Sequence, residues 1–324
     1  MTNDMTTGNP VKLIIYFMIP TCLGNIVQQL YNLAASIVAG RFIGVNALAA
    51  IGSTSSLIFL VIGWLNGLTS GFAILVAQQF GAKRYEKMRH SIAMSIYLCL
   101  AFVTVMTIFL ELLNYPILRL MNAPEEIIGD TGGYMAVIYA GLFVTAAYNA
   151  LAAVLRALGD SRSPLYFLIT SAVINVFLDV AFIVRLGMGV RGCAYATVIA
   201  QGISAALCLV YIIRKFDILK LKREDFRLSF KTMGRLLGMG IPMGLQFSIT
   251  AVGTIIVQGA VNAFGAVYIA GFSAAGKIQS TVSTVFVAFG ATVATFVGQT
   301  RGAGRMDRVR QGVTITQIRV FARS

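Results

Sequence analysis

The stretch QQFGAKRYEKMR, residues 78–89, returns near the end of the chain as QTRGAGRMDRVR, residues 299–310. Five identical positions keep a constant offset of 221 residues: Gln78, Gly81, Ala82, Arg84 and Arg89 recur as Gln299, Gly302, Ala303, Arg305 and Arg310. Chance matches at Gly and Ala are common in apolar helices, whereas matches at Gln and Arg with one fixed spacing are not. The chain therefore contains an internal repeat.

The repeat extends toward the start of each copy. Further matches occur at nearly the same spacing: Ile19-Pro20 with Ile241-Pro242, Gly44 with Gly265, and Ala49 with Ala270. The apolar segments between these points also align. We therefore expect the first two helices of the chain to correspond to the seventh and eighth.

The composition places most of the chain in a membrane. Hydrophobic residues make up 57% of the 324 residues, only 12% are charged, and the mean hydropathy is +0.81. Soluble domains carry about twice this share of charge, so lipid must be the solvent for most of the surface. The net charge of +14 would indicate nucleic acid in a soluble protein, but here the basic residues occupy short connections between apolar stretches. We therefore predict no nucleic-acid partner.

Eight apolar stretches are long enough to span a bilayer, which takes about 20 helical residues. They are 11–37, 47–77, 91–113, 134–156, 164–184, 193–213, 236–260 and 267–297. A ninth begins near Gln311 and is cut off at Ser324. The polar start of the chain has no basic region or cleavage site, so the first stretch is predicted to remain as a helix. The sequence thus predicts an all-α polytopic membrane protein.

The lysines and arginines predict the orientation. With the N-terminus inside, 19 of them fall in inner connections, eight of these within residues 214–235, and only four fall outside: Arg41, Arg119, Arg185 and Arg191. Because positive charge is retained on the cytoplasmic side, we predict a multi-pass protein of the cell (inner) membrane with a cytoplasmic N-terminus.

The repeat and the spans together predict three parts. Residues 1–214 form a complete six-helix bundle, 215–235 a charged amphipathic linker on the cytoplasmic surface, and 236–324 part of a second bundle with helices seven, eight and the start of nine. Because each unit has six helices, an even number, both units begin on the same side of the membrane. The repeat is therefore parallel. In secondary transporters with this architecture the site forms between the halves. A lipid-binding patch is an alternative role for the linker, but we favour a plain interdomain connection, because basic loops commonly serve only topology.

Polar side chains form a stripe on the first helix. Its members share one face because of their spacing: Asn25, Gln28, Gln29, Asn32 and Ser36. The corresponding helix of the second unit carries a weaker stripe that includes Gln246 and Thr250. Amides facing lipid would lack hydrogen-bond partners, so the stripe must face protein or a wet cavity. Helix–helix contact and cavity lining both explain it.

Two polar residues on the fifth helix, Asn175 and Asp179, are four apart and therefore lie on one face. A carboxylate at the membrane centre costs about 2.5–3.5 kcal/mol even on lenient scales, and such groups are usually functional. A carboxyl group that gains and loses a proton, with an amide beside it, suits ion coupling. The alternative is a structural Asp bonded to a neighbouring helix.

Lys277 is the second buried charge, about eleven residues into the eighth helix. It can repel cationic substrate, pair with a carboxylate across a cleft, or cap carbonyl groups in a structural role. No clustered His, Cys and Asp, no nucleophile elbow and no phosphate-binding loop are present in the sequence, so we predict that the protein is not an enzyme.

Four segments resemble one transporter family: LYNLAASIVAGRFIG (30–44), AQQFGAKRYEKMRH (77–90), LRALGDSRSPLYF (155–167) and INVFLDVAFIVRLGMGVRGCAYATVIAQ (174–201). They resemble the multidrug and toxin extrusion (MATE) family of the flippase-like MOP superfamily. The most specific match is the turn R-A-x-G-D-x-x-x-P, from Arg156 through Gly159 and Asp160 to Pro164. Physically, Gly159 gives the turn its conformational freedom, and Pro164 opens the next helix.

The resemblance implies twelve helices in two bundles, and export of cationic or amphipathic drugs and toxins by antiport against protons or sodium, without a cofactor. It assigns coupling to carboxylates of the N-terminal bundle, and Asn175 and Asp179 match its helix-five pair. Ala35 occupies the usual place of a helix-one Asp, so Asp179 would have to act alone. In addition, Val180 occupies the place of a Pro that is common in the family. The final four helices are absent, which we interpret as truncation after about eight of twelve helices.

Three functions follow as hypotheses. The first is a cation-coupled MATE exporter, here in truncated form, whose partners are the bilayer and a small substrate and which acts as a monomer when intact. The second is a lipid-linked oligosaccharide flippase, which would need several cations in its cavity. The third is an inactive membrane fragment.

Overall fold

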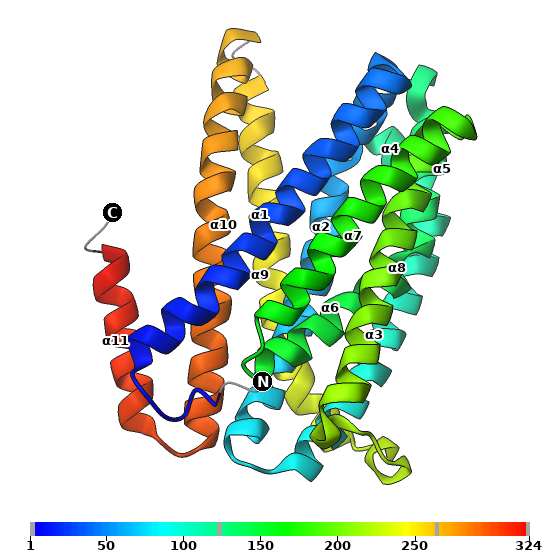
Figure 1. Ribbon diagram of the computed structural model, residues 1–324. Coiled ribbons are helices and arrows are strands. Elements are labelled where there is room, and N and C mark those ends of the chain that lie inside the picture. Colours follow the sequence, from blue (N-terminus) through cyan, green and yellow to red (C-terminus); the bar gives the residue numbers. More distant parts are fainter. Residues whose placement is uncertain (1–3, 122–124, 263–265, 322–324) are drawn as a thin grey trace.

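The computed structural model describes residues 4–121, 125–262 and 266–321, and every regular element within these ranges is helical (Figure 1). The predicted all-α membrane fold is confirmed. In chain order the elements are α1 (Pro10–Phe42), α2 (Val45–Gly81), α3 (Tyr85–Leu112), α4 (Asn114–Leu120), α5 (Glu125–Ala140), α6 (Leu142–Ala157), α7 (Arg162–Val180), η1 (Ala181–Arg185), α8 (Gly189–Lys215), η2 (Asp217–Leu219), η3 (Arg223–Phe226), α9 (Phe230–Asn262), α10 (Ala266–Gly302) and α11 (Met306–Phe321).

Among the described residues seven helices are long and apolar enough to cross a membrane, or eight if α5 and α6 count as one bent span. The predicted stretch 134–156 is thus not one straight helix. It begins earlier, at Glu125, and bends by 45° between α5 and α6. Gly141 lies at the bend, where a Cβ atom would overlap the Val198 side chain of α8. The close approach of α8 explains why a glycine and a bend occur here.

Three further boundaries differ from the sequence-based expectation. The short helix α4 was not predicted. The helix expected from Gln311 begins at Met306, directly after the turn at Gly304. The predicted linker 215–235 contains two 3-10 turns, η2 and η3, and α9 already starts at Phe230. The linker is fixed to α3 by an ion pair between Arg89 Nε and Asp225 Oδ2 (3.2 Å).

The helices form a bundle of eight elements, α1 to α8, with α9 and α10 standing beside it (Figure 1). Helix α1 runs obliquely, packing on both α7 and α10, and α11 turns back along α10. We call the lower end in Figure 1, where α1 begins and where the chain passes from α2 to α3, from α6 to α7 and from α10 to α11, the basic end of the bundle. These segments contain Lys12, Lys83, Arg162 and Arg305. The charge distribution predicts that this end is cytoplasmic.

The two repeat units meet reciprocally at the basic end. A Cβ atom on Gly81 would overlap the backbone oxygen of Gln299, and a Cβ atom on Gly302 would overlap that of Gln78. Each glycine therefore touches the repeat equivalent of the glutamine that lies three residues before it. Two units related by a two-fold axis would make such reciprocal contacts. Gln299 also ties the units together, because it donates to Ala157 O (2.8 Å) and accepts from the Met5 N–H (2.9 Å).

Small residues bring α2 and α9 into backbone contact. Cβ atoms on Gly67 and Gly71 would overlap backbone atoms of Met243, Gly244 and Gly240, which lie on α9. Without a hydrophobic driving force between helices in lipid, such close packing is a main source of association. Helix α2 is thus the element through which the N-terminal bundle holds α9.

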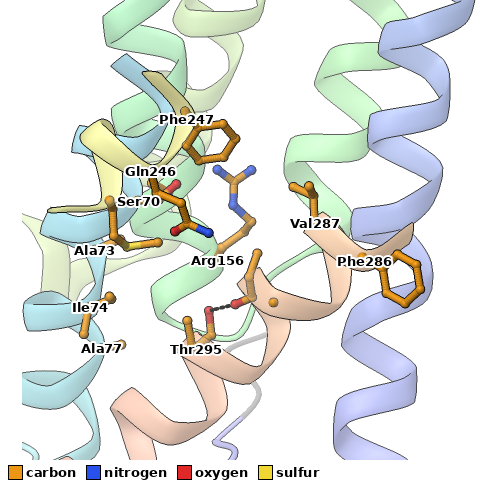
Figure 2. Close-up of a pocket in the computed structure, with 15 residues that line it drawn as sticks. Ser70, Ala73, Ile74, Ala77, Arg156, Gln246, Phe247, Phe286, Val287 and Thr295 are labelled. Atoms are coloured by element: carbon orange, nitrogen blue, oxygen red, sulfur yellow. Dashed lines mark hydrogen bonds between the residues drawn. The ribbon is translucent and has the colours of Figure 1, made fainter. Parts of the chain in front are cut away.

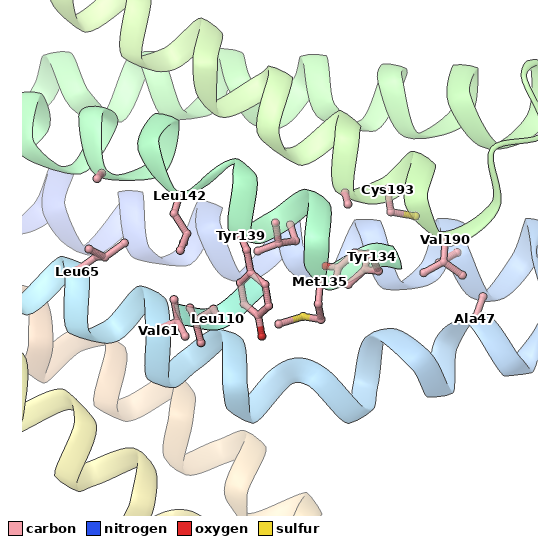
Figure 3. Packing of buried hydrophobic residues seen from close by; sticks show 14 of the residues in the cluster. Ala47, Val61, Leu65, Leu110, Tyr134, Met135, Tyr139, Leu142, Val190 and Cys193 are labelled. Atoms are coloured by element: carbon pink, nitrogen blue, oxygen red, sulfur yellow. The ribbon is translucent and has the colours of Figure 1, made fainter. Parts of the chain in front are cut away.

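The N-terminal bundle has its own apolar core (Figure 3). Helices α1, α2, α3, α5, α6 and α8 contribute to it, and Leu65, Leu110, Met135 and Leu142 are buried members. Tyr134 of α5 and Cys193 of α8 belong to the same cluster. This core fixes the surroundings of the buried acid described next.

Candidate transport site

The turn between α6 and α7 holds both helices in place. Gly159 has φ of 85°, a conformation that favours glycine, which confirms its predicted role. The Asp160 carboxylate then caps α7: it accepts from the backbone N–H of Arg162 (3.2 Å) and Ser163 (3.0 Å), and from Ser163 Oγ (2.6 Å). Tyr211 Oη donates to it as well (3.3 Å). Both carboxylate oxygens of Asp160 therefore accept hydrogen bonds that stabilise the turn and the start of α7.

Asn175 and Asp179 of α7 meet, as their spacing predicts, and both are 0% exposed. With the Asn175 amide oriented to satisfy its neighbours, Nδ2 donates to Asp179 Oδ2 (2.9 Å) and Oδ1 accepts from the Thr197 N–H of α8 (3.2 Å). The second carboxylate oxygen, Oδ1, has no hydrogen-bond partner among the described residues. One side of the carboxyl group is thus fixed, and the other is left free to take a proton or a cation.

Two tyrosines and a cysteine lie near this acid. Tyr31 of α1, Tyr134 of α5 and Cys193 of α8 lie close enough to Asp179 to interact with its charge. Ala35 lies one helical turn beyond Tyr31 on the same face of α1 and carries no carboxylate. The acid therefore sits inside the N-terminal bundle, between helices of one repeat unit.

A separate cavity of about 450 Å³ lies between the repeat units (Figure 2). Helices α2 and α6 form one wall, with Ser70, Ala77 and Arg156, while α9 and α10 form the other, with Gln246 and Phe247 from α9. Apolar side chains dominate the α10 wall, including Phe286 and Val287. In Figure 2 the Arg156 guanidinium projects into the space between the α9 and α10 side chains.

A smaller cavity of about 180 Å³ adjoins the first one. The two share lining residues from four helices: Ser70, Arg156, Phe247, Val287 and Ala291. The smaller one adds Asn25 and Gln28 of α1 and Asn149 of α6. We call the two together the inter-repeat cavity. It is a largely apolar space with a few polar groups, as small-molecule sites usually are.

Comparison with known proteins decides the family. The MatE family model matches residues 20–181, half of the chain. The probable multidrug resistance protein YpnP of Bacillus subtilis is 30% identical over 311 residues, which are 94% of this chain and 68% of YpnP. The chain belongs to the MATE family.

Other relatives agree with this assignment. The probable multidrug resistance protein YoeA of Bacillus subtilis is 30% identical over 308 residues, 92% of this chain and 66% of YoeA. A crystal structure of a MATE protein in a bent conformation superimposes with a TM-score of 0.90 at 25% identity, covering 96% of this chain and 70% of that one. The chain spans about two thirds of the length of these MATE relatives.

The structure brings together only some of the MATE site residues expected from the sequence. Asn25 and Gln28 line the inter-repeat cavity, and Asn25 Nδ2 donates to Thr284 O of α10 (3.4 Å). Gln246 lines it from α9. These three residues converge from both repeat units.

The remaining expected residues lie elsewhere. Gln29, Asn32 and Thr250 are exposed and do not line the cavity. Ser36 Oγ donates to Asn32 O (2.9 Å) and Thr250 Oγ1 to Gln246 O (2.9 Å), so both hydroxyls bond within their own helices. Lys277 belongs to α10, and its side chain lies outside the part that the structure describes.

Sequence reasoning missed the cavity role of three residues, Arg156, Asn149 and Ser70. Arg156 belongs to the R-A-x-G-D turn, where an arginine indicates a helix end rather than a cavity. Asn149 and Ser70 are single polar residues in apolar helices and lack the helical periodicity that singled out the α1 stripe. The one available signal was that Asn149 and Arg156 are seven residues apart, which places them on one face of α6.

Proposed function

We propose that this MATE protein exports amphipathic organic compounds across the cell membrane in exchange for protons or sodium ions, with the basic end cytoplasmic. The observation that carries the proposal is the buried Asp179–Asn175 pair within one repeat unit, in a chain that also has a cavity between the units. The names of YpnP and YoeA as probable multidrug resistance proteins support the substrate class.

Coupling in this proposal is the work of a single carboxyl group. Asp179 alternates between a form that binds a proton or sodium ion and a form that does not, and Asn175 holds it in place. The free Oδ1 atom and the nearby Tyr31 hydroxyl are hard oxygen atoms that suit either ion. One charge moving through about 100 mV supplies about 2.3 kcal/mol, enough for a modest substrate gradient.

The lipid-linked oligosaccharide flippase is the alternative. Its diphosphate would need several cations, whereas Arg156 is the one charged residue among the described residues that line the inter-repeat cavity. We therefore favour drug export. Transfer of a lipid-linked sugar across proteoliposomes that contain the protein would support the alternative instead.

Asp179→Asn tests the proposal directly. The variant keeps the shape and a hydrogen bond to Asn175 but removes the titrating group, so gradient-dependent efflux should fall at least about tenfold. Efflux is measured with ethidium and with carboxyfluorescein in a bacterial strain that lacks its own exporters. Asp217→Asn, which changes an exposed Asp of η2, is the matched control and should retain efflux.

Two results would contradict the proposal. Unchanged, gradient-dependent efflux in the Asp179→Asn variant removes Asp179 from coupling. Failure of the unmodified chain to export either dye faster than cells without it favours the inactive-fragment hypothesis.

A further inference from the structure

Arg156 is a cation without a counter-ion in the described structure. It lies in the last turn of α6, partly buried, and its guanidinium points into the inter-repeat cavity (Figure 2). Arginine stays protonated and carries five N–H donors. None of these donors makes a hydrogen bond or ion pair with the described residues; Tyr148 and Cys208, which lie nearby, are neutral side chains.

The nearest acidic residue in the sequence cannot serve as its partner. Asp160 is four residues away, but both its oxygens already accept hydrogen bonds from the start of α7 and from Tyr211. The dipole of α6 favours a cation in its last turn, yet a dipole leaves N–H donors unpaired. Neither local feature accounts for five donors directed into a cavity.

The rest of the lining does not supply the missing charge. The other described lining residues are neutral, and the polar ones include Asn149, whose buried Nδ2 group has no hydrogen-bond partner. Gln246 lies beside the guanidinium in Figure 2 and adds an amide from the other repeat unit. Arg156, Asn149 and Gln246 together offer unpaired donors and no carboxylate.

We infer that the inter-repeat cavity binds amphipathic organic anions, with a carboxylate, sulfonate or phosphate group held by the Arg156 guanidinium. The apolar part of the ligand then lies against Phe247, Phe286 and Val287. A bidentate guanidinium contact is strong and specific for such groups. The inference rests on the proposed export function and narrows its substrate class, away from the cationic compounds that the family resemblance implies.

Three pyrene probes with the same aromatic body test the inference: pyrenebutanoate (anionic), pyrenebutanol (neutral) and pyrenebutyltrimethylammonium (cationic). Trp64, the one tryptophan of the sequence, packs on Gly244 of α9 close to Gln246, so energy transfer from Trp64 to pyrene reports binding at the cavity. The purified chain in detergent should bind pyrenebutanoate tightest and the cation weakest, with at least about tenfold between them.

Two variants at one position separate charge recognition from structure. Arg156→Gln should bind pyrenebutanoate at least about tenfold more weakly and pyrenebutanol unchanged, whereas Arg156→Lys should keep the preference for the anion in weaker form. Melting curves without probe accompany each titration. A structural role would lower the melting temperature of Arg156→Gln while leaving the order of the three probes intact.

An Arg156→Gln variant that melts earlier but keeps the order of the three probes would overturn the inference. Equally tight binding of the cationic and anionic probes by the unmodified chain would overturn it as well. The ligand can come from solution or from the bilayer. Displacement of pyrenebutanoate by phosphatidylglycerol but not phosphatidylcholine identifies a lipid headgroup as the anion, and no displacement identifies a soluble one. Equal displacement by both lipids would show nonspecific partition and contradict the site.

A failure of the anion site can be distinguished from a failure of the proposed export function. Anion preference without dye efflux rejects export but retains the site. Efflux that depends on Asp179, without anion preference, retains export and rejects the site.

Discussion

Two charged side chains of opposite sign, Asp179 and Arg156, lie in the N-terminal bundle, and their surroundings differ. Asp179 is enclosed by helices of one repeat unit, fully buried and hydrogen-bonded through Asn175 to α8. Arg156 lies at the opposite end of the bundle, points into the space between the repeat units and has no hydrogen-bond partner among the described residues. The first site is a fully buried carboxyl group, while the second opens into a cavity whose volume suits a small organic molecule.

The distance between the two sites excludes direct contact. Leu168 of α7 lines the inter-repeat cavity, and the eleven residues from there to Asp179 correspond to roughly 16 Å along the helix. An ion at Asp179 and a ligand at Arg156 therefore do not touch, and we expect movement of helices to link the two sites. Helix α1 is the element that contacts both: Gln28 lines the cavity, and Tyr31, one turn later, lies beside Asp179.

Replacing an asparagine by leucine near each charge, Asn175 near Asp179 and Asn149 near Arg156, should give the largest contrast in stability. Asn175→Leu leaves Asp179 Oδ2 without its hydrogen-bond donor in the bundle interior, so the free energy of unfolding should fall by about 1–3 kcal/mol. Asn149→Leu removes an amide whose Nδ2 has no partner, so its effect should stay below about 0.5 kcal/mol. Heating with a thiol-reactive dye, which reacts as buried Cys99 and Cys208 become exposed, measures both.

Equal destabilisation by the two variants would break the comparison. It would mean that the Asn149 amide is as well satisfied as that of Asn175. The cavity would then contain a structural network rather than a vacant set of donors.

A smaller effect tests whether Asp160 is a helix cap or a hidden counter-ion of Arg156. Asp160→Ala removes the acceptor for two backbone N–H groups of α7 and should cost about 1 kcal/mol, whereas Asp160→Asn, which still caps a helix, should cost less. Neither variant should change the order in which the pyrene probes bind. A stronger preference for the anion in Asp160→Asn would show that Asp160 partly neutralises Arg156.

The sequence was sufficient for features that depend on spacing along the chain. The repeat was visible because Gln and Arg recur at one offset, and the reciprocal contacts of Gly81 with Gln299 and of Gly302 with Gln78 agree with it. The Asp179–Asn175 pair was visible because residues four apart share a face of any helix. Helix positions followed from the bilayer thickness, which fixes how long an apolar stretch must be.

Features that depend on a distant segment were not predictable. The bend at Gly141 arises because Val198, 57 residues later, packs against it. The stripe on α1 is one face in sequence, but the packing of α7 and α10 determines that Asn25 and Gln28 line the cavity while Gln29 and Asn32 remain outside it. The direction of Arg156 likewise depends on where α9 and α10 lie relative to α6.

The most direct test of two separate but linked sites is the affinity for pyrenebutanoate measured over about pH 6 to 8 and over a series of sodium concentrations, where the probe remains ionised. The unmodified chain should show an affinity that depends on one of these ions, because linked sites change each other's affinity reciprocally. Asp179→Asn should remove the ion dependence and keep the anion preference, and Arg156→Gln should do the opposite. If either variant removed both properties, or if the ion dependence survived in Asp179→Asn, the two charges would not act as the separate sites described here.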